Sequence, residues 1–165
     1  MRIPPRPLSE LYRLHAASVF RRARRLLGNE AEAHEVVQDL FVSLLERPEQ
    51  FAGRSTMSTF LYGATTHLCL NRLRNERNRA RLMRGRTEPA EEAPHTSADD
   101  VLALRAALAS LPTQLAEVAV YYFVDELSHQ EIATLLGCSR RHVGNLVLRV
   151  QQWGQAQEED ACSAS

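Results

Sequence analysis

Arg141 and Asn145 are residues of the types that read base edges in the major groove of DNA. They are four positions apart, so on a helix both side chains lie on one face. Arginine can donate two hydrogen bonds to guanine, and asparagine can pair with adenine. The polar residues beside them that could contact the same DNA are Ser139, Arg140, His142 and Arg149. The pattern indicates a DNA-reading helix.

The stretch around these residues, 127–150, has the features of a helix–turn–helix. Ser128, with Glu131 three positions later, predicts the capped start of a first helix. Gly137 allows a left-handed turn after that helix, and Ser139 can cap the next one. The second helix would bury one apolar stripe, formed by Val143, Leu146, Val147 and Val150. In such a motif the second helix enters the major groove, with Arg141 and Asn145 pointing away from the stripe.

The predicted reading helix is weakly charged for a DNA-binding element. Arg140, Arg141 and Arg149 are its arginines, and Gly144 weakens the helix. The net charge of the chain is zero, but residues 1–87 hold 16 Arg against 8 acidic residues, and residues 88–165 hold 4 Arg against 12. Phosphate neutralisation supplies most nonspecific affinity for DNA. We therefore expect this helix alone to bind DNA poorly and the first half to dominate the electrostatics.

A basic stretch at residues 71–86, "NRLRNERNRARLMRGR", supplies positive charge in the first half. It continues a segment with helical spacing that begins near Ser58. The residues in it that could hold phosphates are Asn71, Arg72, Arg74, Arg77 and Arg79. The alternative interpretation is a solvated helix face, which the density of positive charge disfavours.

Glu35, Gln38 and Asp39 form a third candidate site. They are three and four positions apart, so they make one polar patch on a helix whose other positions are largely apolar. An ordinary solvated face would have the same appearance. The patch is therefore a candidate contact surface for another molecule.

The spacing of apolar residues predicts helices throughout and no strand. The expected fold is all-α, with two small helical domains, at 9–84 and 101–153, joined by a flexible acidic linker at 85–100. A capping-box pattern at Asn29 and Glu32 starts the second helix, and Pro48 ends it. Residues 154–165 read as a disordered acidic tail.

Several classes of protein are disfavoured by composition. Cys69, Cys138 and Cys162 are far apart, which disfavours a disulfide framework or a zinc knuckle. No apolar run is long enough to span a membrane, and the N-terminus has no apolar signal core, so we expect a cytoplasmic protein. No phosphate loop, metal-ligand cluster or ordered nucleophile and base is present, so we expect neither an enzyme nor a cofactor or metal.

The order and spacing of three segments resemble the extracytoplasmic-function (ECF) group of sigma-70 family RNA polymerase sigma factors. Residues 11–45, "LYRLHAASVFRRARRLLGNEAEAHEVVQDLFVSLL", resemble the start of the family's region 2, and residues 51–79, "FAGRSTMSTFLYGATTHLCLNRLRNERNR", resemble its promoter-melting part. Residues 111–150, "LPTQLAEVAVYYFVDELSHQEIATLLGCSRRHVGNLVLRV", resemble region 4. The resemblance covers residues 9–153.

This resemblance implies a division of labour between the two domains. Region 2 would bind the clamp helices of core RNA polymerase and open the downstream promoter element. Region 4 would read the upstream element of promoter DNA while docked on the polymerase flap. An anti-sigma factor is the further partner that the resemblance implies.

The resemblance also implies site residues. The clamp-binding motif corresponds to "EVVQDLF" (35–41), so the polymerase-binding residues would be Glu35, Gln38, Asp39 and Phe41. The loop before the basic helix would line a pocket for unpaired bases with Arg54, Ser55, Thr56, Met57 and Ser58, and the basic helix would hold the phosphates. Phe60 stands where the family usually has Trp, and Gly63 and Gly144 stand where it often has basic residues.

Two other functions fit parts of the sequence. A stand-alone helix–turn–helix regulator would explain the second domain without needing the polar patch at residues 35–39. A sigma-like decoy that binds an anti-sigma factor and no promoter would fit the weakly charged reading helix. Binding to core polymerase and promoter-specific transcription separate the three possibilities.

Overall fold

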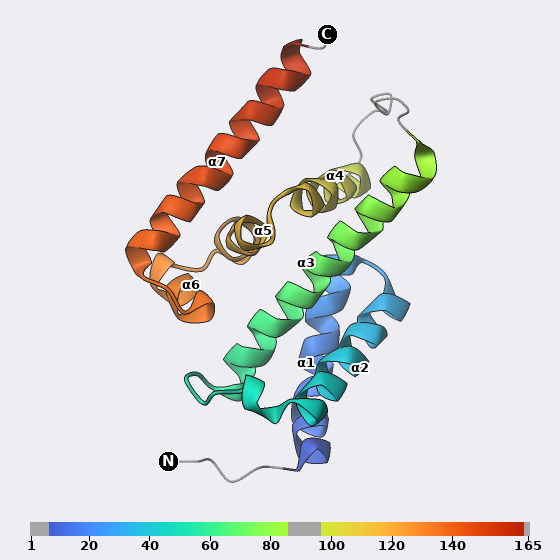
Figure 1. Cartoon of the computed structure of the whole chain (residues 1–165), viewed down its shortest axis with the longest axis vertical. Coiled ribbons are helices and arrows are strands. Elements are labelled where there is room, and N and C mark those ends of the chain that lie inside the picture. The colour runs from blue at the N-terminus through green and yellow to red at the C-terminus, as the bar shows by residue number, and fades with distance from the viewer. Residues whose placement is uncertain (1–6, 86–96, 164–165) are drawn as a thin grey trace. The chain divides into compact units, whose positions relative to one another are not determined.

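The computed structural model describes residues 7–85 and 97–163, and every regular element in those ranges is helical (Figure 1). The prediction of an all-α protein is therefore confirmed. Contacts between residues divide the chain into two compact units, Met1–Ser110 and Leu111–Ser165. Most of the predicted linker, residues 86–96, lies outside the described residues, whereas its last four residues already belong to a helix.

The first unit is built on three helices, α1 (Leu8–Leu27), α2 (Glu30–Glu46) and α3 (Met57–Arg84), with a short 3-10 turn at Pro48–Gln50. Their ends follow from local chemistry. Gly28 has φ 72° and donates its N–H to the Arg24 carbonyl, which closes α1. Asn29 caps α2 by accepting the Glu32 N–H at 3.2 Å, and Thr56 caps α3 by accepting the Thr59 N–H at 3.2 Å.

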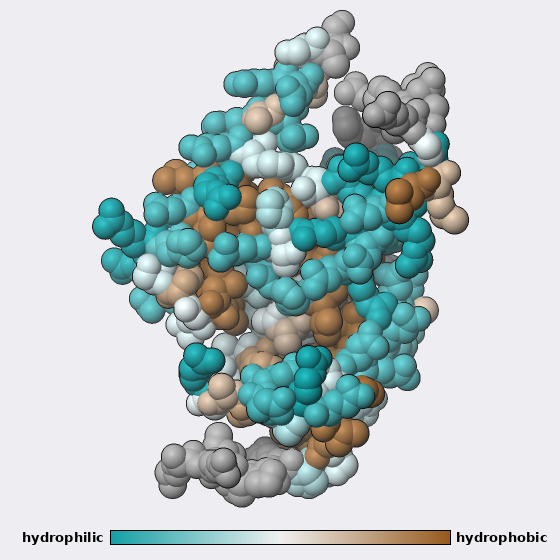
Figure 2. Space-filling model, in the orientation of Figure 1, coloured by the Kyte–Doolittle hydropathy of each residue, from teal (hydrophilic) through white to brown (hydrophobic). Residues whose placement is uncertain are grey.

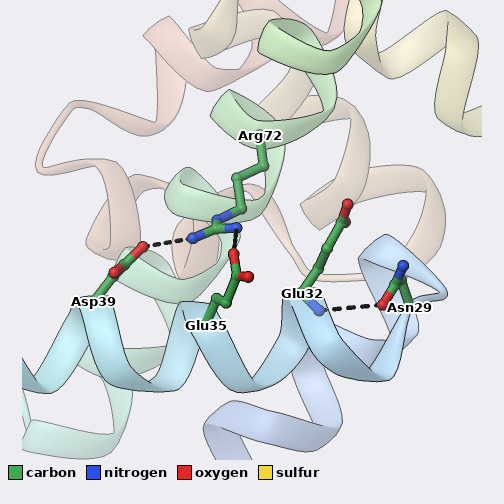
Figure 3. A network of polar contacts seen from close by, with 5 residues as sticks. All are labelled: Asn29, Glu32, Glu35, Asp39 and Arg72. Carbon is green, nitrogen blue, oxygen red and sulfur yellow. Dashed lines mark hydrogen bonds and ion pairs between the residues drawn. The ribbon is translucent and has the colours of Figure 1, made fainter.

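The Asn29 cap is one-sided. The predicted capping box also needs the Glu32 carboxylate to turn back toward Asn29. In Figure 3 the contact drawn between the two residues is the hydrogen bond from the Glu32 N–H to the Asn29 side chain, and none joins the Glu32 carboxylate to Asn29. The sequence pattern therefore predicted the start of the helix correctly, although only one of the two hydrogen bonds forms.

Apolar residues at helical spacing from all three helices form the core of this unit. The buried cluster consists of Val19 from α1, Val37, Leu40, Phe41 and Leu44 from α2, and Leu61 from α3. Helix α3 buries Leu61, Cys69 and Leu73 along one side, together with two threonines. Thr65 and Thr66 are buried, and each hydroxyl donates to the carbonyl four residues earlier. This buried side determines which residues of α3 remain at the surface.

The helix α4 (Ser97–Ser110) packs against α3 in the first unit. Its Arg105 donates from Nε to the Leu26 carbonyl at 2.8 Å and from Nη2 to the Arg25 carbonyl at 3.3 Å. The last carbonyls of a helix have no partner within the helix, and a cation there also opposes the negative end of the helix dipole. The predicted boundaries placed residues 101–110 with the second domain, whereas this contact ties them to the end of α1.

The second unit contains α5 (Thr113–Ala119), a π-helical turn (Val120–Val124), α6 (His129–Leu136) and α7 (Arg140–Ser163). Its most deeply buried large side chains include Tyr121, Ile132 and Leu146. After the π-helical turn Glu126 has φ 55°, and the Leu127 N–H donates to the Tyr121 carbonyl. This turn ends the helical stretch that begins at Thr113 and redirects the chain into α6.

The helix–turn–helix forms as its sequence signals predict. Ser128 and Glu131 make the complete capping box, in which the Glu131 carboxylate also accepts the Ser128 N–H at 2.8 Å. The Ser128 hydroxyl, which donates to the same carboxylate at 2.7 Å, and the Ser128 N–H together hold the pKa of Glu131 below its ordinary value. Gly137 has φ 64° and ends α6. The cap and the glycine therefore set the lengths and the join of the two helices.

Helix α7 is longer than predicted. The stretch from Gly154 was expected to be a disordered tail, but the helix continues to Ser163. The residues involved are mostly exposed and include Gln, Ala and Glu, which favour helix even without packing. In Figure 2 the end of α7, at the top of the view, is covered mainly by hydrophilic side chains. The expectation of disorder rested on the acidic composition and the terminal position of this stretch, although its residues have good helix propensity.

We predict that Arg105→Ala loosens α4 from the first unit. The substitution removes both hydrogen bonds to the end of α1, and the free energy of unfolding of this unit should fall by about 1–2 kcal/mol. Hydrogen exchange should show faster exchange of α4 amides. The exposed Arg13 provides a control, because Arg13→Ala makes the same charge change without these bonds. Unchanged α4 protection would show that the cap does not hold the helix.

Candidate functional site

The predicted polar patch on α2 is exposed. Glu35, Gln38 and Asp39 all lie at the surface, opposite the buried Val36, Val37 and Leu40. The exposed face continues with Val42 and Leu45, and the Leu45 side chain is 65% exposed. Leu45 is three positions from Val42 and seven from Gln38, so its spacing already indicated that it shares the polar face.

Arg72 on α3 bridges the two carboxylates of this patch (Figure 3). Its Nη1 donates to Oε2 of Glu35 at 2.8 Å, and its Nη2 donates to Oδ2 of Asp39 at 2.5 Å. Partial burial lowers the pKa of Arg72, but the hydrogen bonds to Glu35 and Asp39 outweigh it and hold that pKa above the ordinary value. Two patches that the sequence suggested separately, one acidic and one basic, are therefore joined at this residue.

Phe41 belongs to the core of the first unit. It is only 4% exposed, and its ring packs edge-on against Tyr12 with the ring centroids 5.0 Å apart. The resemblance to sigma factors had implied that Phe41 is one of the polymerase-binding residues. Its position, two residues after Asp39, turns it away from the exposed face and toward α1.

The loop before α3 contributes fewer free side chains than predicted. Arg54 and Ser58 are exposed. Ser55 donates its hydroxyl to the Thr56 carbonyl at 3.3 Å, and Thr56 is the N-cap of α3. Met57 packs against the core cluster. Phe60, which stands where the family usually has Trp, packs edge-on against Phe51 with the centroids 5.5 Å apart.

The basic residues of α3 divide between different faces of the helix. Arg77 and Arg79 are exposed, whereas Asn71 and Arg74 are half-buried. Arg74 and Arg77 are three positions apart and share one face, on which Arg81 also lies. Arg79 is seven positions from Arg72 and lies on the face of that residue. The residues predicted to hold phosphates therefore lie on two different faces of α3. On one of these faces Arg72 is already bound to the carboxylates of α2.

A constellation at the α1–α3 contact was not found from the sequence. The Arg22 guanidinium donates to the Thr66 hydroxyl at 3.2 Å and 3.0 Å, and it lies 4.1 Å from the centroid of the Tyr62 ring. A cleft of about 200 Å³ adjoins it, with His15 and Ser58 in its lining. Arg22 and Thr66 are 44 positions apart, so no local pattern could have indicated this contact.

The second helix of the helix–turn–helix exposes the predicted DNA-reading residues. Arg140, Arg141, His142, Asn145 and Arg149 are all exposed on α7, and the predicted stripe of Val143, Leu146, Val147 and Val150 is buried. Leu148, a large apolar residue, is 56% exposed on the same helix. Ser139 has a structural role, because its hydroxyl accepts the His142 N–H at 3.1 Å. The arrangement can present donors and one apolar group to a DNA groove.

The three cysteines form no common site. Cys69 is buried, Cys138 is half-buried and Cys162 is exposed. Burial raises the pKa of the Cys69 thiol to about 12, although Arg22 and Arg72 oppose that shift. No group of three or more His, Cys, Asp or Glu that could hold a metal occurs within residues 7–85 and 97–163. Within the same ranges, no helix is long and apolar enough to cross a membrane.

Comparison with protein families identifies both units. Residues 11–79 match the family model for sigma-70 region 2, and residues 102–150 match the model for sigma-70, region 4. The chain is 33% identical over 159 residues to the ECF RNA polymerase sigma factor SigE of Mycolicibacterium smegmatis, and 26% identical over 164 residues to the ECF RNA polymerase sigma factor SigW of Bacillus subtilis. The chain belongs to the ECF group of the sigma-70 family. Because this family is non-enzymatic, its membership also confirms that the chain is not an enzyme.

The extent of these matches differs between relatives. The match to SigE covers 85% of this chain but 59% of SigE, and the match to SigW covers 87% of each. RNA polymerase sigma factor YlaC of Bacillus subtilis is 26% identical over 153 residues, and the match again covers 87% of each chain. The region 4 match begins at residue 102, so it includes most of α4, which packs with region 2 in the structure.

Solved structures resemble the chain in fold. The sigma factor RpoE from Bartonella quintana, solved in complex with the anti-sigma factor NepR, aligns with a TM-score of 0.50 at 17% identity, covering 87% of this chain and 91% of that one. CnrH, solved in complex with the cytosolic domain of CnrY, aligns with a TM-score of 0.52 at 23% identity, covering 93% and 88%. At these identities the likeness concerns the fold alone.

We predict that Ser139 acts as a helix cap more than as a DNA contact. Ser139→Ala should lower the free energy of unfolding of the second unit by about 0.5–2 kcal/mol, because the first turn of α7 loses its cap. Ser139→Asn can accept the same hydrogen bond and should restore most of that stability. Urea denaturation of the three proteins measures the effect. Equal stability of the wild-type and alanine proteins would show that the Ser139 cap does not stabilise α7.

Proposed function

We propose that this chain is a promoter-selecting subunit of bacterial RNA polymerase, with region 2 binding the core enzyme and opening the downstream element while region 4 reads the upstream element. The observation that carries the proposal is the exposed patch of Glu35, Gln38 and Asp39 on α2. A stand-alone helix–turn–helix regulator has no need of such a surface. The matches to both sigma-70 regions, in the family's order, support the same proposal.

Polymerase binding is assigned to the outer face of α2. The two carboxylates and the Gln38 amide offer acceptors for basic and amide donors on the polymerase clamp. Val42 and Leu45 extend this face with exposed apolar surface, which is the composition of a protein interface rather than of a solvated helix. Phe41 supports the patch from inside the core.

Upstream-element recognition is assigned to the exposed face of α7. Arg141 and Asn145 would make the base contacts, and Arg140, His142 and Arg149 would contribute phosphate or further polar contacts. The helix has few charges, so its affinity for DNA alone is expected to be low. Attachment to polymerase through region 2 would supply the missing affinity by raising the effective concentration of α7 near the promoter.

Downstream opening is assigned to the loop before α3 and the basic part of that helix. Arg54, Ser55 and Ser58 would contact unpaired bases, and Arg74, Arg77 and Arg79 would hold the phosphates of the separated strand. Arg72 is a weaker candidate for a phosphate contact than Arg77 or Arg79, because it already holds two carboxylates. Asn71 and Met57 would act through packing more than through direct contact.

An anti-sigma factor is the further partner that we propose. The support is the likeness in fold to the RpoE chain that was solved with its anti-sigma factor NepR. The weakly charged α7 keeps a second candidate function open, a decoy that binds an anti-sigma factor without selecting a promoter. Run-off transcription with core polymerase on a promoter pool distinguishes the two, because only a promoter-selecting subunit supports it.

We predict that Gln38→Ala combined with Asp39→Arg weakens binding to core RNA polymerase by at least about tenfold, or roughly 1.4 kcal/mol. The change removes two acceptors and places a positive charge against a surface that is expected to be basic. A fluorescence titration of labelled protein measures the affinity, and circular dichroism checks folding. Glu49→Arg is the matched control, since it reverses an exposed charge away from the patch. Equal affinities for the two variants would remove the patch from polymerase binding.

We also predict that Arg141→Ala and Asn145→Ala each cost about 1–3 kcal/mol on the preferred upstream element and relax base choice there. Transcription from a randomised promoter library with reconstituted polymerase measures both effects. Gln155→Ala, an exposed position farther along α7, is the control. Base preferences that survive both substitutions would place recognition on other residues.

A further inference from the structure

Arg72 donates its hydrogen bonds to two different carboxylates on α2. One guanidinium reaches two carboxylates that lie one helical turn apart, through a separate nitrogen for each (Figure 3). Each carboxylate uses one oxygen, Oε2 of Glu35 and Oδ2 of Asp39. The second oxygen of each makes no further hydrogen bond or ion pair within the part of the chain that the structure describes. Two acceptors are thus held in place while their outer oxygens remain available.

Fold stability does not account for this arrangement. The side chains of Glu35 and Asp39 are 61% and 58% exposed, whereas that of Arg72 is 28% exposed. Ion pairs with partners so exposed to water add little to folding stability. The packing of α2 on α3 is secured by buried apolar residues such as Leu40 and Leu61. The network instead sets the orientation of two surface carboxylates.

Without Arg72 the two carboxylates would repel each other. Like charges four positions apart on a helix are unfavourable, and free carboxylate side chains would rotate away from one another in water. The guanidinium fork is planar and presents its donors in a fixed geometry, so it can fix both carboxylates at once. A lysine ammonium in its place would attract them without setting their orientation.

We propose that Arg72 is a positioning residue for polymerase binding, which holds Glu35 and Asp39 with their outer oxygens directed at basic or amide donors on the core enzyme. This inference rests on the proposed function of the α2 patch. It gives α3 a second role, because the helix assigned to the separated DNA strand also organises the polymerase contact on the neighbouring helix. Arg72 then acts through the two carboxylates and not through a phosphate.

Two opposing effects decide the sign of the expected result. Ordering a flexible side chain in advance is worth roughly two- to tenfold in affinity for each side chain. The positive charge of Arg72 would repel a basic partner group, but about 6 Å of water reduces that cost to roughly threefold. With two side chains ordered, the favourable effect is the larger one. Loss of Arg72 should therefore weaken binding rather than strengthen it.

The first measurement is the affinity of full-length protein for core polymerase in the absence of DNA. Arg72→Gln should weaken it by about three- to tenfold, and Arg72→Lys should restore part of the loss. Arg81→Gln is the matched control, because it removes an exposed positive charge from the same helix and should change the affinity by less than about twofold. Thermal unfolding tests the fold of each variant, and the lysine variant carries the test if the glutamine variant does not fold.

The second measurement tests whether Arg72 acts through its partners. In the Glu35→Gln/Asp39→Asn background, Arg72→Gln should have no further effect on polymerase affinity, because there are no charged acceptors left to position. An equal loss in both backgrounds would mean that Arg72 contacts polymerase directly, which overturns the inference. Unchanged or tighter binding by Arg72→Gln in the otherwise wild-type chain overturns it as well.

The same variants separate this inference from the proposed function. If Glu35→Gln/Asp39→Asn binds polymerase as well as the wild type does, the α2 patch is not the polymerase surface, and both proposals fail. If that variant binds weakly while Arg72→Gln binds normally, the patch stands and the positioning role fails. Only weak binding by both, without additivity, supports the two proposals together.

Discussion

Burial of one side of α3 is the constraint on which the first unit depends. Leu61, Cys69 and Leu73 lie at helical spacing and are buried. Once that side is buried, the helical repeat dictates where every other residue of α3 points. Arg72 must then lie over α2, while Arg77 and Arg79 remain in water. A single helix therefore serves the core, the α2 patch and a basic surface, and a change in its rotation would disturb all three.

The charge and the candidate contact residues are divided between the two units. The first has the positive charge and the exposed acceptor patch, and the second has the exposed residues that we propose to read bases, with little charge to support them. Neither share is sufficient for tight and specific promoter binding, because phosphate contacts supply affinity and base contacts supply specificity. A larger assembly that holds both units near DNA resolves this difficulty, since linked weak contacts reinforce one another.

Helix α4 belongs to the first unit in the structure, although most of it falls within the stretch that matches region 4. The region 4 match begins at residue 102, yet Arg105 caps the end of α1 in the first unit. The compact units divide between Ser110 and Leu111, immediately before Pro112. The structural boundary therefore lies within the stretch that the family assigns to region 4. The reason is tertiary, because the last carbonyls of α1 obtain donors from a residue about 80 positions away.

Local chemistry allowed much of this protein to be predicted from its sequence. Asn29, Gly28 and Ser128 set helix ends through contacts with residues at most four positions away, and the buried stripe of α7 follows from helical spacing alone. The resemblance to sigma factors likewise rested on contiguous segments, and the family matches confirm it. The error at the end of α7 came from treating an acidic terminal stretch as disordered where helix propensity was high.

Contacts between distant residues were decided only by the tertiary structure. Phe41 could have been surface or core until α1 was seen to place Tyr12 against it. Arg72 could have been one phosphate ligand among several until α3 was seen to place its guanidinium against Asp39, a residue 33 positions earlier in the sequence. Sequence spacing specifies which residues share a face of one helix, but it does not specify which face of another helix they meet. That choice depends on how the helices pack, and here it turned one arginine of a basic run into the organiser of an acidic patch.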